Sequence, residues 1–262
     1  IFLRKNPPLN TTMLNFLDSI KDETFIVNDV EGLRKANNKL YTASFHGPSS
    51  EYLPKTYVSK NIEYLKSVVM NNPEDKMILK PLDGYGGSGV IVIEKSAKNN
   101  LNSLLDFYIN SKAGRHYIIL QEYIEGAENG DIRVLMLNGE PIGAYRRVPA
   151  DGEVRANISV GGSARKHVLT KEEIRICKKI GKHLVQDGIY FAGLDLINNK
   201  LLEVNVQSPG GIVNINKMNK TRLEKKVIDF IEEKVHEREE WNERKEFRLK
   251  KKKSFKEEVN NA

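Results

Sequence analysis

Residues 77–93 read MILKPLDGYGGSGVIVI, a sequence in which two apolar runs flank a glycine-rich turn. The first run is Met77–Pro81. The second run, Val90–Ile93, consists of β-branched residues, which favour strands over helices. Glycine tolerates the backbone conformations that a tight turn needs. The stretch therefore predicts two strands joined by a glycine-rich loop, with Lys80 at the mouth of the first strand.

The loop Gly84–Gly89 matches the pattern G-x-G-x-x-G, which on its own is a weak sign of phosphate binding. A dinucleotide-binding loop leads directly into a helix, and a P-loop ends in Gly-Lys-Ser/Thr, but neither follows here. A protein kinase has its lysine after the loop, whereas Lys80 precedes this one. We expect the free backbone N–H groups to close over phosphate oxygens. The alternative is a glycine-rich hairpin with a structural role alone.

A second polar cluster is expected on a late hairpin formed by Gly193–Ile197 and Leu201–Asn205. Glu203 and Asn205 are two residues apart on one strand and share a face, and Asp195 lies on the neighbouring strand. Burial of such acids among apolar residues is costly without a cation, and oxygen ligands suit Mg²⁺. The hairpin therefore predicts a magnesium site, with solvent-facing acids as the alternative.

Arginines lie between these two motifs, at Arg133, Arg146, Arg147 and Arg155. Arginine keeps its charge and binds phosphate or carboxylate with two parallel hydrogen bonds, so the set favours phosphoryl chemistry. Residues 148–166 form a long, glycine-bearing stretch, which predicts a lid over the substrate. The short loop 207–211 is rich in backbone donors and is expected to hold a carboxylate beside the metal.

The rest of the chain mixes helices and strands, with several hairpins. The clearest helix is Lys171–Asp187, whose apolar residues recur at helical spacing behind a capping box at residues 170–173. The turn Asn138-Gly139 predicts a hairpin of Asp131–Leu137 with Pro141–Arg147. Such a mixture favours an α+β fold with antiparallel sheets. We also expect helices near 11–20, 61–70, 101–109 and 220–234, and strands at 1–3, 24–27, 56–58, 117–123 and within the late hairpin.

Composition limits the location and the partners of the chain. The 262 residues carry a formal charge of +7 at pH 7, which suits an anionic ligand such as a nucleotide. The single cysteine, Cys177, predicts a cytoplasmic protein and is interpreted as a buried hydrophobe rather than a nucleophile. No apolar run approaches the roughly 20 residues of a membrane span, so no membrane is expected. The lysine-rich residues 250–253 are interpreted as part of a solvated helical tail, not a nucleic-acid site, because no aromatic stacking motif accompanies them.

Five motifs follow one another along the chain. They are Lys80-Pro-Leu-Asp-Gly-Tyr-Gly-Gly, Gly130-Asp-Ile-Arg-Val-Leu, Asn157 with Gly161-Gly162, Gly193-Leu-Asp, and Glu203-Val-Asn205 with Ser208-Pro209. Taken together and in order, they resemble the motifs of the prokaryotic glutathione synthetases, which are ATP-grasp ligases. The resemblance covers about residues 1–235 and implies an ATP-grasp fold, in which two α+β subdomains with antiparallel sheets grip ATP between them.

The resemblance implies a reaction without a protein nucleophile. Magnesium ATP phosphorylates the C-terminal carboxylate of γ-glutamylcysteine, and the amine of glycine attacks the acyl phosphate to give glutathione, ADP and phosphate. Positioning and charge neutralisation carry such a phosphoryl step.

The resemblance also implies a role for each site residue. The nucleotide would be bound at its phosphates by Lys39, Lys80, Gly86, Gly87 and Ser88, at its adenine by Gln121, Glu122, Tyr123 and Ile124, and near its ribose by Asp131. The Mg²⁺ or Mn²⁺ ligands would be Asp195, Glu203 and Asn205. The transferring phosphate would be steadied by Arg133 and Arg147. The acceptor or product would be faced by Arg155, Asn157, Ser208 and Gly210.

The expected domain organisation also follows from the resemblance. Residues 1–38 are a remnant of, or a linker from, a first domain expected before Ile1, and residues 39–118 form the small subdomain with the glycine-rich cover. Residues 119–235 form the large subdomain with the magnesium and acceptor sites, and residues 236–262 form a charged helical tail. Assembly as a homo-oligomer is left open.

Two departures from the family pattern keep other functions open. The family's Asp-Pro-Pro-Phe-Asp is here Asn6–Asn10, and its Thr-Ser-Pro-Thr is here Gln207–Gly210. The second change touches the acceptor loop, so another ATP-grasp ligase that adds an amino acid to a different peptide or protein tail is an alternative. A nucleotide-binding remnant without activity is a further alternative.

Overall fold

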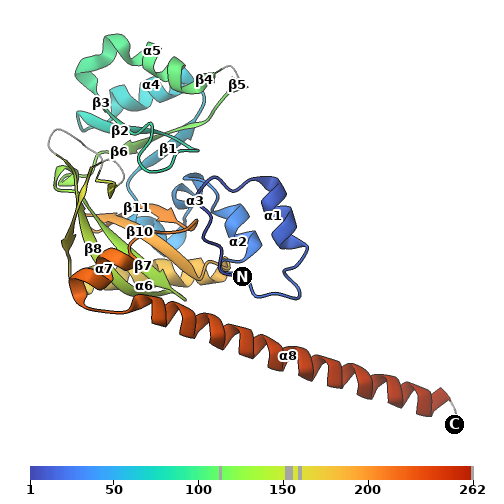
Figure 1. Cartoon of the computed structure of the whole chain (residues 1–262). Coiled ribbons are helices and arrows are strands. Elements are labelled where there is room, and N and C mark those ends of the chain that lie inside the picture. The colour runs from blue at the N-terminus through green and yellow to red at the C-terminus, as the bar shows by residue number, and fades with distance from the viewer. Residues whose placement is uncertain (112–113, 151–155, 159–160, 261–262) are drawn as a thin grey trace.

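Figure 1 shows the computed structural model of the chain, which has a smaller upper lobe, a larger lower lobe and a long C-terminal helix. The structure describes residues 1–111, 114–150, 156–158 and 161–260. All the strands named below pair in an antiparallel manner, and a single parallel bridge joins Phe2 to Val27. The fold is therefore α+β with antiparallel sheets, as the sequence predicts.

The smaller lobe is a four-stranded sheet of order β1-β6-β2-β3 with helices α4 and α5 on one face. Residues alternate across β2, so that Met77 and Leu79 pack against the two helices while Ile78 and Lys80 face the larger lobe. The elements of this lobe are β1 (Thr56–Ser59), α4 (Ile62–Asn71), β2 (Lys76–Pro81), β3 (Ile91–Glu94), η2 (Lys95–Ala97), α5 (Lys98–Ile109), β4 (Asn110–Ser111), β5 (Gly114–Arg115) and β6 (Ile118–Glu122).

The larger lobe is built on a five-stranded sheet of order β11-β10-β7-β8-β9. Helix α6 begins at a capping box. The Thr170 hydroxyl accepts a hydrogen bond from the Glu173 backbone N–H, and the Glu173 carboxylate accepts one from the Thr170 backbone N–H. The elements are η3 (Ala127–Asn129), β7 (Asp131–Leu137), β8 (Glu140–Val148), β9 (Ser163–Lys166), α6 (Lys171–Gln186), β10 (Phe191–Ile197), β11 (Lys200–Asn205), α7 (Ile212–Asn219) and α8 (Leu223–Asn260).

The two faces of this sheet pack against different hydrophobic cores. On β7, Ile132, Val134 and Met136 face one core, which also contains the apolar stripe of α6. On the other face of β7, Leu135 and Leu137 pack under α7 and α8. That second face is apolar at one end only, because the same alternation puts charged residues at its other end, next to the smaller lobe.

The N-terminal segment belongs to the larger lobe by its packing. Its buried residues, Leu14, Leu33 and Tyr41 among them, share one core with α6 and the large sheet. The elements of this segment are α1 (Thr11–Asp18), α2 (Val30–Lys35), α3 (Leu40–Ala43) and η1 (Gly47–Tyr52). The expected boundary between the subdomains lies after residue 118, whereas β6 (Ile118–Glu122) pairs with β1 and β2 of the small sheet.

Several elements differ from the sequence expectation. In place of the strands expected at residues 1–3 and 24–27, the structure has a single bridge between Phe2 and Val27. Its backbone hydrogen bonds run from Leu3 N to Val27 O and from Val27 N to Ile1 O. The helix expected at 220–234 begins at Leu223 and continues to Asn260 as α8. The separate helix α7 before it ends where Lys220 adopts a left-handed conformation (φ 54°). The short elements α2, α7 and β9 were not expected, since a few residues carry too little periodicity to detect.

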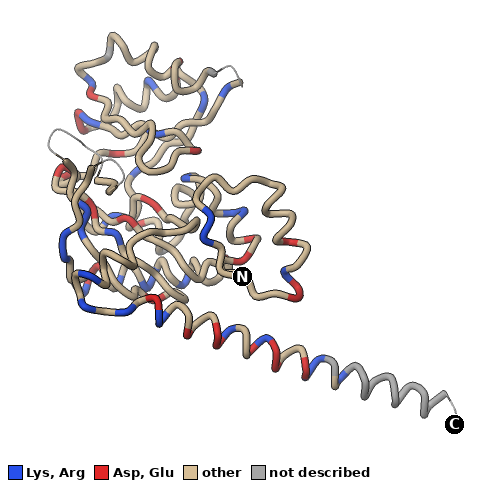
Figure 2. Tube along the Cα trace, in the orientation of Figure 1, with Lys and Arg blue, Asp and Glu red and all other residues tan. Residues whose placement is uncertain are grey.

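Helix α8 leaves the body after its first turns. Leu223, Val227 and Phe230 are buried against the large sheet, and Arg238 donates to the carbonyl of Lys21 at 2.6 Å. Beyond this contact the helix extends away from the body (Figure 1). Figure 2 shows acidic and basic residues interspersed along its described part. Pairs such as Arg244–Glu240 (2.8 Å) stabilise a solvated helix by about 0.2–0.5 kcal/mol each.

Helix α6 lies so close to the sheet at Gly181 that we expect no side chain to be tolerated at this position. A Cβ on Gly181 would overlap the backbone of Gly139, in the turn between β7 and β8. Replacement of a helical glycine by alanine normally stabilises by roughly 0.5–1 kcal/mol, so Gly181→Ala tests the contact cleanly. We expect the variant to lose about 1–3 kcal/mol of unfolding free energy in denaturant titrations. Gly210→Ala is the control, because a Cβ there meets nothing within 4 Å. An unchanged or higher stability of Gly181→Ala would show that the two elements are packed less closely.

Candidate functional site

A cavity of about 870 Å³, its open mouth included, lies between the facing sheets of the two lobes. Strands β2 and β6 line it from the small lobe, and β7, β8, β10 and β11 line it from the large lobe. Its size is within the range of small-molecule sites. Predicted site residues among its lining are Lys39, Lys80, Gly87, Gln121, Glu122, Tyr123, Ile124, Asp131, Arg147, Asn157, Asp195 and Glu203.

The small lobe contributes a buried lysine held by an amide. Lys80 Nζ donates to Gln121 Oε1 at 2.9 Å, and Gln121 Nε2 donates to Thr56 Oγ1 at 2.9 Å. Burial lowers the pKa of Lys80 to about 8, although the negative charge of Glu203 opposes the shift. The amide of Gln121 therefore fixes the lysine, a function that the sequence interpretation, which assigned Gln121 to the adenine, did not include.

The glycine-rich turn joins β2 to β3 and is fastened to the large lobe by Lys39. Gly86, Gly87 and Gly89 adopt positive φ angles of 62°, 79° and 71°, which explains the choice of glycine. Lys39 Nζ donates to the carbonyl of Gly84 and lies 3.7 Å from Glu203 Oε1. Gly87 lines the cavity, whereas Gly86 and Ser88 are not among its lining residues.

One end of the cavity is apolar. Chain residues 122–124 follow β6 and pass from the small to the large lobe, and the Glu122 carboxylate accepts from the Lys55 backbone at 3.0 Å. Apolar side chains that the sequence analysis did not single out complete this end. They are Ile78, Val90, Ile197 and Leu202. Ile78 could have been found from its alternation with Lys80, since both lie on one face of β2.

A bulge between β10 and β11 decides which acids reach the cavity. Asp195 pairs with Glu203, but Leu196 pairs with Leu201, so Leu202 is an extra residue on β11. Because of this insertion, Leu201 is buried in the core while Glu203, two residues later, lies beside Asp195. In a regular strand the two would share a face.

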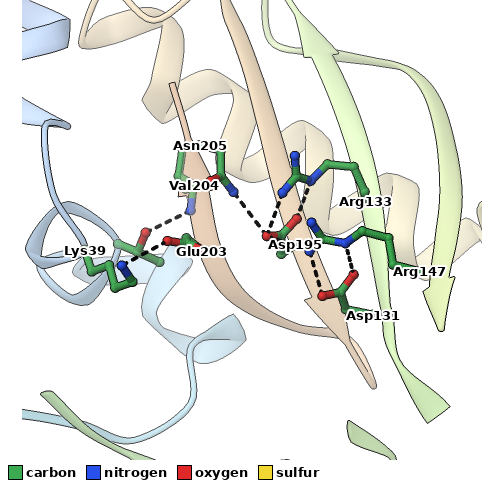
Figure 3. Close-up of polar contacts among 9 residues, drawn as sticks. Lys39, Asp131, Arg133, Arg147, Asp195, Glu203, Val204 and Asn205 are labelled. Carbon is green, nitrogen blue, oxygen red and sulfur yellow. Dashed lines mark hydrogen bonds and ion pairs between the residues drawn. The ribbon is translucent and has the colours of Figure 1, made fainter. Parts of the chain in front are cut away.

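Two arginines hold the buried carboxylate of Asp195 (Figure 3). Arg133 binds it with Nε (2.5 Å) and Nη2 (3.0 Å), and Arg147 Nη2 lies 2.9 Å from its Oδ2. Asn205 Nδ2 donates to the same oxygen at 3.1 Å. Arg147 also binds Asp131 through Nε and Nη2, both at 2.6 Å. The result is a ladder of alternating charges across β7, β8 and β10.

The electrostatics of the two acids differ. Burial opposes the ionisation of Asp195, but the charges of Arg133 and Arg147 outweigh it and keep the pKa of Asp195 below its usual value. Burial, together with the negative charge of Asp195, raises the pKa of Asp131 against the opposing effect of Arg147. Burial opposes the charge of Arg147, but the carboxylates of Asp195 and Asp131 outweigh it and raise the pKa of Arg147, so this guanidinium stays charged.

The donor set of the late hairpin fits a hard divalent cation in its chemistry. Asp195, Glu203 and Asn205 offer carboxylate and amide oxygens, the ligands that Mg²⁺ prefers. In the part of the chain that the structure describes, no group of three or more His, Cys, Asp or Glu residues gathers as a metal site. The charges of these acids are instead balanced by Arg133, Arg147 and Lys39.

A second, smaller hollow of about 390 Å³, mouth included, adjoins the first and shares Lys39 and Glu203 with it. Gln207 and Asn205 line it, as do Asn37 and Asn38. Gln207 Nε2 donates to Asn37 Oδ1 at 2.8 Å, while its own Oε1 is buried without a hydrogen-bond partner among the described residues. The sequence analysis noted Gln207 as a departure from the family pattern but gave it no role.

Some predicted site residues lie elsewhere. Arg133 is buried against Asp195 and is not among the lining residues of either cavity. Ser208 and Gly210 are not lining residues of these two cavities either, and the carbonyl of Pro209 between them accepts from Arg4 at 3.3 Å. Arg155 lies outside the described residues.

Two further expectations concern the body of the protein. Cys177 is buried in α6, and burial raises the pKa of its thiol to about 12, which agrees with a structural hydrophobe. Within the described residues, no helix combines the length and the apolar character that crossing a bilayer requires.

Comparison with known proteins places the chain in a family. The family model of the prokaryotic glutathione synthetase ATP-grasp domain matches residues 38–220. Glutathione synthetase of Thermosynechococcus vestitus is 37% identical over 235 residues, which cover 88% of this chain and 71% of that protein. Glutathione synthetase of Agrobacterium fabrum is 34% identical over 237 residues, or 89% of this chain and 72% of that protein.

Solved structures show the same fold at low sequence identity. D-cycloserine synthetase DcsG superposes with a TM-score of 0.58 at 19% identity, over 76% of this chain and 71% of that one. The ATP-grasp ligase PsnB, complexed with a minimal precursor, gives 0.55 at 15% identity, over 80% and 64%. The chain therefore has the ATP-grasp fold.

The depressed pKa of Lys80 predicts a pH-dependent affinity for ATP. The charged lysine attracts phosphate, and its positive charge is lost as the pH rises through about 8. Affinity for a non-hydrolysable ATP analogue, measured by calorimetry, should therefore fall by up to about tenfold per pH unit above that value. Lys80→Arg should flatten the profile, because arginine keeps its charge. Lys76→Arg, at an exposed position, should keep the wild-type profile. A wild-type profile that stays flat up to about pH 9.5 would show that Lys80 does not meet the phosphates.

Proposed function

The chain belongs to the prokaryotic glutathione synthetase family, and from that premise we propose that it joins γ-glutamylcysteine to glycine, forming glutathione, ADP and phosphate from ATP. Family and fold make it an ATP-dependent ligase that forms carbon–nitrogen bonds. One observation supports the proposed reaction above all others. A single cavity presents Lys80 and Lys39 beside Asp195, Glu203 and Arg147, which is the charge pattern that a phosphoryl transfer to a carboxylate requires.

ATP would lie across this cavity, with its base at the apolar end. The backbone of residues 122–124 offers hydrogen-bond partners there, between Ile78 and Leu202. The phosphates would lie toward Lys80 and under Gly87. Since Lys80 is buried and already oriented by Gln121, little side-chain entropy is lost when it meets an anion.

A divalent cation would be held by Asp195, Glu203 and Asn205. When bound, it would neutralise charge on the nucleotide phosphates during transfer. Glu203 is the acid best placed to change partners, because its side chain is 31% exposed and lies 3.7 Å from Lys39. Asp195 is more tightly held, by Arg133 and Arg147, so these arginines would share its carboxylate with the cation.

The acceptor would bind where the two cavities meet. Lys39 and Glu203 line both, so a carboxylate in the smaller hollow would lie next to the phosphate end of the larger one. The carboxylate oxygen would attack the terminal phosphorus of ATP, and an amine would then displace phosphate from the acyl group. Arg147, which lines the cavity, would stabilise the transferring phosphoryl group.

A second candidate is an ATP-grasp ligase for a different peptide. The Gln207–Asn37 pair supports it, because two amides line the smaller hollow and one buried oxygen is left without a partner. Such a lining favours a substrate with additional N–H donors. The two candidates share the ATP chemistry and differ in the acceptor alone.

The proposed setting is the cytoplasm, since Cys177 is the single cysteine of the chain and offers no partner for an internal disulfide. ATP and small peptide or amino-acid substrates are the proposed partners. Nucleic acid and membrane are not proposed as partners.

The proposed reaction is tested directly with magnesium ATP and a panel of peptides and amines. We expect ADP release and a new product of glutathione mass with γ-glutamylcysteine and glycine, measured by coupled assay and mass spectrometry. Product with other pairs alone would select the second candidate. Tight ATP binding without any product would mean that the chain binds the nucleotide but does not act as proposed.

The metal assignment is tested by Glu203→Gln. The variant keeps the size and polarity of the side chain but removes its charge, so turnover should fall by on the order of 100-fold or more while the melting temperature stays near wild type. Glu140→Gln is the matched control, since Glu140 is exposed and pairs with Lys178 far from the cavity. Wild-type turnover in Glu203→Gln would show that Glu203 is not a metal ligand.

A further inference from the structure

Asp131 has a partner that its assumed place near the ribose does not explain. Its two carboxylate oxygens accept from Arg147 Nε and Nη2, both at 2.6 Å, and its side chain is 13% exposed (Figure 3). Paired hydrogen bonds of this kind are among the strongest that a carboxylate makes. The carboxylate is thus directed at the arginine, which itself is 4% exposed.

We propose that Asp131 is a positioning residue that fixes the Arg147 guanidinium for phosphoryl transfer. The proposal rests on the proposed function and assigns Asp131 a task in it: Asp131 acts on the phosphoryl step through Arg147.

The geometry of Arg147 explains why it needs an anchor. Its Nη2 also lies 2.9 Å from Asp195 Oδ2, an oxygen that Arg133 and Asn205 bind as well. Without Asp131, the guanidinium would have Asp195 as its remaining carboxylate partner and would be drawn toward it. With Asp131, Nε and Nη2 are fixed, and the two hydrogens on Nη1 are not used in either carboxylate pair.

The backbone supports the same pairing. Asp131 and Arg147 are directly opposite each other in the antiparallel register of β7 and β8, so their side chains share a face. Gly130, just before Asp131, has a φ of 87°, and a Cβ there would overlap the carbonyl of Arg147. The close approach of the strands at this point holds the two side chains at short range.

The proposal is tested with Asp131→Asn, which keeps the shape of the side chain but weakens its grip on Arg147. We expect kcat to fall by about 10–100-fold, with a rise in the KM for ATP of at most about tenfold. The same loss should appear with 2′-deoxy-ATP and 3′-deoxy-ATP. If the loss disappears with either analogue, Asp131 binds the ribose and the proposal is wrong.

A double-mutant cycle with Arg147→Lys separates action through Arg147 from independent action. Lysine cannot make the paired bonds, so Arg147→Lys should lose as much activity as Asp131→Asn. The double variant should then lose little more than either single variant. Losses that multiply would overturn the proposal, because they would mean that the two residues act separately.

A binding measurement keeps the test independent of the acceptor. In Asp131→Asn, the affinity for a non-hydrolysable ATP analogue should fall about tenfold more than the affinity for ADP, since Arg147 would contact the terminal phosphate. Equal effects on the two nucleotides would contradict the proposal even if γ-glutamylcysteine is not the substrate. If wild type makes no product while the analogue still shows this difference, the proposed reaction fails and the role of Asp131 stands.

A second variant covers the case in which Asp131→Asn does not fold. Asp131→Glu keeps the charge but moves the carboxylate outward by one methylene, so Arg147 stays paired and is displaced. We expect a near wild-type melting temperature with a kcat loss and the same selective effect on the ATP analogue. Wild-type kcat in a folded Asp131→Glu would overturn the proposal.

Discussion

The ion-pair ladder in the large sheet is the constraint on which the site depends. Asp195 is buried and is compensated by Arg133 and Arg147, and the second of these is compensated in turn by Asp131. Loss of one partner from such a buried set leaves an uncompensated charge and lowers the free energy of unfolding by about 3–5 kcal/mol, although the complete set adds little to stability. The ladder is therefore better explained by the chemistry of the cavity than by the stability of the fold. It holds charges at the sheet surface in a fixed arrangement, which is what transfer of a highly charged group needs.

The large sheet can carry this ladder because one of its faces is divided. Leu135 and Phe191 lie at one end of that face under α7 and α8, while Arg133 and Asp195 lie at the other end. The strands thus change from apolar to charged along their length, without any change in their alternation. Burial of the apolar end anchors the sheet, and the charged end is left to the small lobe. The bulge at Leu202 adjusts the last strand to this division, because it brings Glu203 to the charged end while Leu201 stays in the core.

Much of this arrangement could be predicted from the sequence. The stretch around Lys80 gave the right strand–turn–strand order because glycine and β-branched residues act locally, and the face shared by Glu203 and Asn205 follows from strand periodicity. The partners of the charged residues could not be predicted, since a pair such as Asp195 with Arg133 depends on register between strands far apart in the chain. For the same reason, the expectation for Gln121 missed its bond to Lys80. Short elements such as α7 were missed because so few residues carry too little periodicity to detect, and the left-handed Lys220 that ends α7 carries no signal of its own. The expected roles of the site residues in catalysis stay predictions.

Lys39 connects the two lobes more directly than any other described side chain in the cavity. It precedes α3, whose Thr42 accepts from the Val204 backbone of β11 at 3.1 Å, so its backbone belongs to the large lobe. Its Nζ, however, donates to the carbonyl of Gly84 in the glycine-rich turn and lies near Glu203. An anion that enters between the turn and β11 would offer this lysine a charged partner in place of a neutral carbonyl, and charge-assisted hydrogen bonds are roughly twice as strong as neutral ones. The turn would then be released from Lys39 at the moment when its own N–H groups gain a ligand. A single side chain can in this way couple phosphate binding to the conformation of the loop that covers it, without any contact between the loop and the acids of the large sheet.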